Sequence, residues 1–304
     1  MARKIRIPRP RFGAVRSAVR SAVWSAIWSG LWESVAPACG YAGCAHSAGA
    51  WGRMRRRSRG VRMLGSRYCR SECLERALGE VLRRTRFASR DAGRVSHRIP
   101  LGLLLLSRQQ LTAEQLQAGL EAQRRAMTPV KIGACLQRLG FATEREITAA
   151  LARQWSCPLL QSNAAGLSAD RSPQIPMPLL EFFRMIPVAL VEATGKLLMA
   201  FSEGIDYTAL YAIEQMLGYR TEACLVCPSV LQKSLEDLAR RRGAGDVVIE
   251  HVEDTGECAR IVGNYSAKVG AEEVRFARCG EHLWIRLTRR RRETLNLVLR
   301  VTGS

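Results

Sequence analysis

Residues 101–123 read LGLLLLSRQQLTAEQLQAGLEAQ, and residues 132–154 read IGACLQRLGFATEREITAALARQ. The second stretch repeats the pattern of the first at an offset of 31 residues. In both copies glycine is the second residue and glutamine is the last, with aliphatic residues at equivalent places between them. We expect the two copies to fold against each other, so that their glycine ends and glutamine ends meet at one shared groove.

Each copy also contains a T-x-x-[QE] capping box, formed by Thr112 with Gln115 and by Thr143 with Glu146. In such a box the threonine side chain accepts a backbone N–H, and the Gln or Glu side chain accepts one in return. Each box therefore predicts the start of a helix. The order in each copy is an apolar run, a turn, a capping box and a helix.

The charge of the chain is concentrated at its N-terminus. The 304 residues carry a formal net charge of +20, and residues 1–97 hold 21 of the 47 basic residues but only 5 of the 27 acidic ones. Such a segment is typical of a solvated leader or of a region that seeks an anionic partner such as nucleic acid. No run of 18 or more apolar residues occurs, so the sequence predicts no membrane-spanning helix.

We expect an α+β fold in which a duplicated helical subdomain is followed by small α/β layers, with a basic N-terminal leader and a zinc knuckle before them. The expected parts are a basic amphipathic leader (1–35), a cysteine-containing module with a helix (36–97) and the duplicated helical subdomain (98–156). They are followed by an α/β subdomain (157–242) and a small α+β C-terminal domain (243–304). In the last two parts the pattern predicts a hairpin at residues 185–203 and helices at residues 207–218, 228–242 and 254–270. It also predicts strands at residues 219–227, 272–278, 282–288 and 294–301.

The leader contains the run SAVRSAVWSAIWSGLW at residues 17–32, in which aliphatic residues and tryptophans recur every four positions. This spacing places them on one face of a helix. Three interpretations stay open: a helix on a membrane surface, a helix that docks to a protein, or a stretch before the true start. Because no secretory signal is recognised, we expect a cytoplasmic protein, or one peripheral to the membrane.

Four cysteines in two close pairs are a candidate metal site. Cys39 and Cys44 form C-x4-C, and Cys69 and Cys73 form C-x3-C. Two such pairs suit tetrahedral Zn²⁺, with His46 as a spare ligand, whereas the alternative is four unligated thiols.

A further close pair, Cys224 and Cys227, resembles half of a redox or zinc site. In a strand, however, residues three apart face opposite sides. We therefore interpret these two as structural thiols.

The repeat resembles the N-terminal, MshE-like, cyclic-di-GMP-binding domain of type II secretion and type IV pilus assembly ATPases. The unit of that family begins Arg-Leu-Gly, continues with spaced aliphatic residues and a second glycine, and ends in Gln. Here the first copy matches at Leu101, Gly102, Leu105, Leu106, Leu111, Leu116, Leu120 and Gln123. The second copy matches at Ile132, Gly133, Leu136, Gly140, Phe141, Ile147, Leu151 and Gln154. The resemblance covers roughly residues 98–240.

In the family, the two units clasp one cyclic dinucleotide. Arginine stacks on guanine and pairs with phosphate, glycine lets the backbone come close, leucines cover the bases and the Gln amide bonds a base edge. The resemblance thus implies a cyclic-di-GMP site made by Arg98, Leu101, Gly102, Leu105, Leu116, Leu120, Gln123, Lys131, Ile132, Gly133, Leu136, Ile147, Leu151 and Gln154.

The chain departs from the family at three informative positions. Pro100 and Lys131 stand where the family has arginine, and Gln109 replaces the inner glycine of the first copy. A repeat that keeps the fold without the ligand is therefore the alternative.

The ATPase half of the family is missing, since no G-x-x-x-x-G-K-[ST] motif occurs. Four histidines also lack carboxylates or nucleophiles at catalytic spacings, so we expect a protein that is not an enzyme. We predict a bacterial regulatory or adaptor protein that senses a cyclic dinucleotide or docks to secretion or pilus machinery. The rival is a nucleic-acid-binding protein that acts through residues 1–97.

Overall fold

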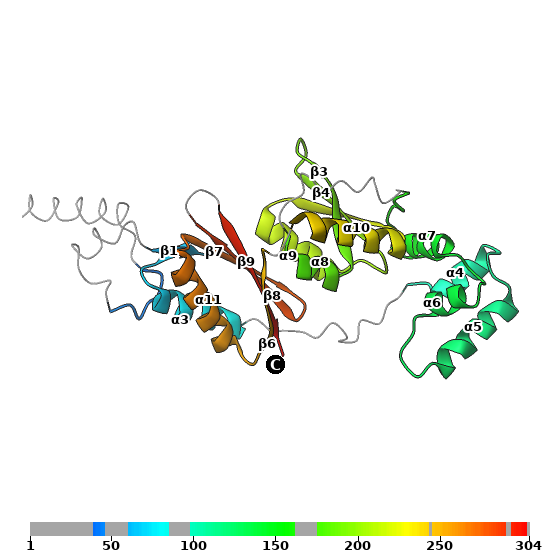
Figure 1. Cartoon of the computed structure of the whole chain (residues 1–304), viewed down its shortest axis with the longest axis horizontal. Helices are drawn as coiled ribbons and strands as arrows, with labels where there is room; N and C mark the ends of the chain where they lie inside the picture. Colours follow the sequence, from blue (N-terminus) through cyan, green and yellow to red (C-terminus); the bar gives the residue numbers. More distant parts are fainter. Residues whose placement is uncertain are drawn as a thin grey trace, which may run out of the picture.

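The computed structural model describes residues 39–45, 60–84, 98–161, 175–242, 245–289 and 293–302. The stretch at 17–32 and His46 lie outside the described residues. The described elements confirm the α+β class and fall into three parts, which are the repeat helices, a three-stranded layer and a six-stranded sheet (Figure 1). Within the described ranges, no helix combines the length and the apolar character needed to span a lipid bilayer.

The repeat forms four helices, which are α4 (Leu101–Ser107), α5 (Ala113–Arg125), α6 (Ile132–Arg138) and α7 (Glu144–Gln154). Both capping boxes are confirmed. The hydroxyl groups of Thr112 and Thr143 each accept a backbone N–H three residues on, and the side chains of Gln115 and Glu146 accept in return. The local signal therefore placed the second helix of each copy correctly.

The middle part contains α8 (Met177–Phe182), β3 (Met185–Val191), β4 (Lys196–Phe201), α9 (Tyr207–Leu217), β5 (Arg220–Leu225) and α10 (Pro228–Arg242). Its sheet has the order β3-β4-β5, with β3 antiparallel and β5 parallel to β4. The predicted hairpin is present. As predicted, α9 ends at Gly218, whose φ of 76° lies in the left-handed region that favours glycine.

The last part is a sheet with the strand order β2-β1-β7-β8-β9-β6. Its strands are β1 (Val61–Met63), β2 (Ser66–Tyr68), β6 (Val247–Val252), β7 (Glu273–Cys279), β8 (His282–Thr288) and β9 (Thr294–Val301). Two helices, α3 (Ser71–Arg84) and α11 (Thr255–Val269), pack against each other and share one hydrophobic core with this sheet (Figure 1).

Residues 60–84 and 245–302, which the sequence pattern assigns to two separate parts, thus share one sheet and one core. The parallel pairing of β1 with β7 joins them, through Arg62 with Glu273 and Met63 with Val274. Strands of three residues give almost no periodic signal, so β1 and β2 were not predicted.

Strand β6 was not predicted either. It carries Glu250 and His251 on its exposed positions, and the following acidic residues resemble the start of a helix. The helix itself begins later, at Thr255, after Asp254 caps it.

The three-stranded layer is attached to both of its neighbours by polar contacts. On one side, the Asp246 carboxylate accepts from the Met177 backbone N–H at 3.0 Å and from the Asn296 amide at 3.0 Å. On the other side, the Glu144 carboxylate at the start of α7 accepts from the backbone N–H and the hydroxyl group of Ser229, both at 2.7 Å. These contacts hold the repeat against the start of α10.

Candidate functional site

Each helix of one copy of the repeat packs mainly against a helix of the other copy. Helix α4 contacts mainly α7, and α5 contacts mainly α6, so the first helix of each copy lies against the second helix of the other. The contact between α5 and α6 is close. A Cβ atom added at Gly119 would lie 2.6 Å from Cδ2 of Leu136, a fully buried side chain.

A reciprocal pair of hydrogen bonds, here called the glutamine clasp, links the copies. The Gln123 amide donates to the carbonyl oxygen of Val130 at 2.7 Å, and the Gln154 amide donates to the carbonyl oxygen of Ile99 at 2.6 Å. Ile99 and Val130 are equivalent at the repeat offset, and each precedes the first helix of its copy. The glutamine end of each copy therefore contacts the glycine end of the other, as the repeat predicted. In this structure both amides donate to backbone carbonyls, whereas the resemblance implied that they bond a base edge.

The recurring glycines have a role within their own copy. A Cβ atom at Gly102 would lie 2.6 Å from Cδ1 of Leu116, and one at Gly133 would lie 3.1 Å from Cγ2 of Ile147. Leu116 and Ile147 are also equivalent at the repeat offset. Each glycine thus lets the two helices of its own copy approach closely.

The clasp gives a first prediction. Replacing Gln154 with alanine should lower the free energy of unfolding of the repeat by about 1 kcal/mol, because the Ile99 carbonyl loses its donor. Urea unfolding of the full chain would measure the change. Gln137→Ala, at an exposed position of α6, is the matched control and should cost nothing. Equal stability of the Gln154→Ala variant and the unaltered protein would contradict a role for the clasp.

Two exposed cations lie beside the clasp. Arg98 stacks on the Trp155 ring, with its guanidinium carbon 3.3 Å from the ring centroid, and Lys131 forms an ion pair with Glu203. A Cβ atom at Gly204 would lie 2.7 Å from the Trp155 ring, so Glu203 and Trp155 belong to adjoining surfaces. The fold therefore brings Arg98 and Lys131 to one region, although 33 positions separate them in the sequence.

The other candidate ligand residues are mostly part of the packing between helices. Buried residues among them are Leu101, Gly102, Leu105, Gly133, Leu136 and Ile147; half-buried ones are Leu116, Leu120, Gln123, Ile132, Leu151 and Gln154. Trp155 was not singled out from the sequence. Its position directly after Gln154 is the only signal that could have found it.

The four cysteines of the two close pairs meet in space. The Sγ atoms of Cys39, Cys44, Cys69 and Cys73 all lie within 4.8 Å of one another. Cys44 and Cys69 are 3.6 Å apart and Cys69 and Cys73 are 3.8 Å apart, measured between sulfur atoms. A tetrahedral Zn²⁺ with Zn–S bonds of about 2.3 Å separates its sulfur ligands by about 3.8 Å. This cluster has the geometry to hold a metal ion.

Local structure brings these thiols together. Cys69 follows the β1–β2 hairpin, whose turn residues Leu64 and Gly65 have φ values of 50° and 77°, as a type I′ turn requires. Cys73 lies in the first turn of α3, and the loop at 39–45 is tied to the hairpin because the Gly40 N–H donates to the Arg67 carbonyl at 2.8 Å.

Burial raises the pKa of the Cys73 and Cys69 thiols above their ordinary value. A bound cation would favour the thiolate form of both side chains. The thiols of the cluster must therefore lose their protons before they can bind a cation as thiolate ligands.

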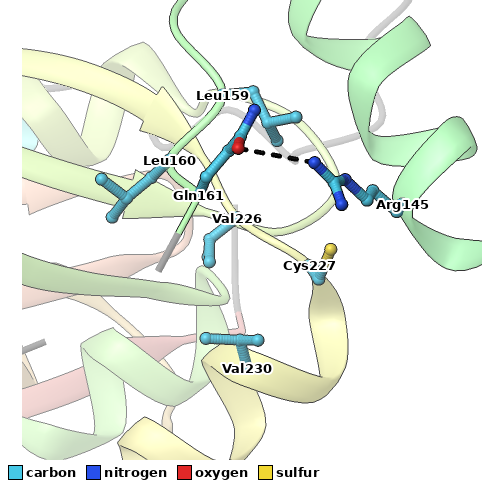
Figure 2. A pocket seen from close by; sticks show the side chains of 7 residues that line it. All are labelled: Arg145, Leu159, Leu160, Gln161, Val226, Cys227 and Val230. Atoms are coloured by element: carbon cyan, nitrogen blue, oxygen red, sulfur yellow. Dashed lines mark hydrogen bonds between the residues drawn. The ribbon is translucent and has the colours of Figure 1, made fainter. Parts of the chain in front are cut away.

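The second cysteine pair behaves differently. Cys224 is buried in β5, and burial raises the pKa of its thiol to about 12. Cys227 is half-buried and lies after the strand, where it lines a cavity of about 320 Å³ with Arg145, Gln161 and Val230 (Figure 2). The two thiols therefore have separate surroundings.

No protein-family model and no curated protein sequence matches this chain. The chain is similar to solved structures of MshE and XpsE. A structure of MshE with cdg matches 46% of this chain and 99% of its own length, at 25% identity and a TM-score of 0.39. The N-terminal domain of XpsE matches 45% of this chain and 92% of its own length, at 23% identity and a TM-score of 0.35.

The MshE-like resemblance that the repeat predicted thus agrees with a similarity to MshE and to the N-terminal domain of XpsE over about 45% of the chain.

Proposed function

We propose that this chain is a non-enzymatic regulatory adaptor whose duplicated helical module binds a cyclic dinucleotide, with cyclic-di-GMP as the ligand. One observation supports this most directly: the fold gathers Arg98 and Lys131 beside the glutamine clasp. A ligand with two phosphates needs cations from two places, and guanidinium and ammonium groups are the usual phosphate partners. The ion pair of Lys131 is exposed, so a phosphate can replace its carboxylate at little cost.

Calorimetric titration of the purified full chain with cyclic-di-GMP tests the proposal. We expect binding that weakens about tenfold in Lys131→Ala and in Arg98→Ala, because each loses a charge-assisted contact with phosphate. Both side chains are exposed, so the fold should tolerate the changes. Arg138→Ala, which removes an exposed cation from α6, is the matched control and should bind normally.

Absence of measurable heat at high micromolar cyclic-di-GMP would exclude the ligand. Cyclic-di-AMP serves as the specificity control.

As a regulatory adaptor, the protein would dock to components of secretion or type IV pilus machinery in a bacterial cytoplasm or at its membrane surface. The resemblance of the repeat supports this, and the missing nucleotide-hydrolysis motif supports a role without catalysis. We further propose Zn²⁺ as the ion of the four-cysteine cluster, because an all-thiolate tetrahedral site is typical of structural zinc.

The nucleic-acid alternative concerns residues 1–97, and most of their arginines lie outside the described residues. Removing the whole segment would also remove β1, β2 and α3 from the core of the six-stranded sheet. Substitution of single arginines is therefore the better way to alter the charge of this region.

A further inference from the structure

A groove of about 420 Å³ lies between α9, the face of β4 and β5, and the segment that follows α7. Its most prominent side chains are aromatic. Tyr211 is 70% exposed and Tyr207 is 47% exposed, and the Tyr207 ring lies 6.3 Å from the Trp155 ring, between centroids. Large aromatic side chains left this open to water are typical of contact surfaces, since monomers rarely expose clustered apolar area.

The charged lining of the groove is entirely acidic. Glu214 and Glu222 line it, and among the described residues no lysine or arginine does. The charge of Glu222 is compensated by an ion pair with Lys196. The Glu214 carboxylate instead accepts hydrogen bonds from the uncharged backbone N–H and hydroxyl group of Thr221.

Glu214 is held in a fixed orientation. Its Oε1 atom accepts from the backbone N–H of Thr221 at 2.7 Å and from the Thr221 hydroxyl group at 2.9 Å. These bonds leave the second carboxylate oxygen to accept from a ligand. A preoriented carboxylate beside aromatic rings is the arrangement that recognises a guanidinium or ammonium group.

The protein already shows this chemistry at the edge of the groove. The guanidinium group of Arg98 stacks on Trp155, which also lines the groove. A planar cation therefore fits against these rings. A nucleotide is less suitable inside the groove, because Glu214 and Glu222 would repel its phosphates.

We propose that this aromatic–acidic groove docks an arginine-bearing basic peptide of a partner protein. The arginine side chain would lie against Tyr207 and Tyr211, and its N–H groups would donate to Glu214. Docking of a partner peptide rests on the adaptor role proposed above. It does not require the cyclic dinucleotide, so the two proposals can fail separately.

Fluorescence anisotropy of a fluorescein-labelled peptide with the sequence Gly-Arg-Gly-Arg-Gly-Arg, added to the full chain at low salt, tests the groove. We expect saturable binding that weakens about threefold to fivefold in Tyr211→Ala, in proportion to one lost cation–π contact. Glu214→Gln should weaken it by at least as much, since an amide keeps the acceptor for Thr221 but loses the charge. Glu181→Gln, an exposed carboxylate outside the groove, is the control and should bind like the unaltered protein.

The peptide in which glutamate replaces arginine should not bind. Binding by Tyr211→Ala and Glu214→Gln that is as tight as binding by the unaltered protein would overturn the proposal, as would the absence of saturable binding. Displacement of the peptide by GMP at lower concentration than by free arginine would make the groove a nucleotide site instead. Thermal melts of both variants show whether they fold, and exposed Tyr211 is the position least able to affect folding.

Discussion

Replacing Cys73 with serine should abolish the binding of one Zn²⁺ per chain and lower the thermal stability of the six-stranded part. Cys73 lies in the first turn of α3 and in the core that α3 shares with the sheet. Structural zinc contributes about 10–16 kcal/mol in small zinc-finger peptides. Here the ion would tie a short loop to a sheet that has its own core, so we expect a fraction of that value.

Metal analysis of the purified chain by mass spectrometry, together with thermal unfolding, measures this effect. The unaltered protein should contain one zinc per chain and should lose stability when a chelator removes it. Cys227→Ser changes a half-buried thiol outside the cluster, so its metal content should be unchanged. An unaltered protein that melts at the same temperature with and without chelator, or that carries no metal, would contradict the proposed zinc site.

A second large effect is expected where the copies of the repeat meet. Gly119→Ala should destabilise the protein by about 1–3 kcal/mol, because the new Cβ atom would lie 2.6 Å from a methyl carbon of Leu136. Leu136 is fully buried between the helices and has little space to move. The usual gain from alanine in a helix, about 0.5–1 kcal/mol, is too small to offset this clash.

Gly79→Ala in α3 is the matched control, since its Cβ atom would meet only Ala259 at an ordinary distance of 3.7 Å. That variant should be more stable than the unaltered protein by up to about 1 kcal/mol. Urea unfolding of both variants provides the comparison. Adding Leu136→Ala to Gly119→Ala should relieve the clash, so the two changes should cost less than the sum of their separate effects. Equal stability of the two glycine variants would refute the close packing of α5 on α6.

Much of the local structure could be predicted, because its causes lie within a few neighbouring residues. The capping boxes at Thr112 and Thr143 act over three positions, and Gly218 ends α9 through its own backbone conformation. The four cysteines were also predicted as a cluster, since C-x4-C and C-x3-C are spacings with a chemical meaning. Strands β1, β2 and β6 were missed because they are short or carry charges, and distant partners stabilise them.

The sequence by itself determined that a helical unit is written twice, that each copy has a capped second helix, and that two cysteine pairs precede it. Only the tertiary structure decided that the first helix of each copy packs on the second helix of the other. It also decided that the glutamine of each copy donates to a backbone carbonyl of the other. It also decided that Trp155 lies under Arg98 and that the cysteine module completes the C-terminal sheet. The physical reason is that caps and spacings depend on neighbours in the chain, whereas the partner of a buried face is chosen by shape among segments far apart in the sequence.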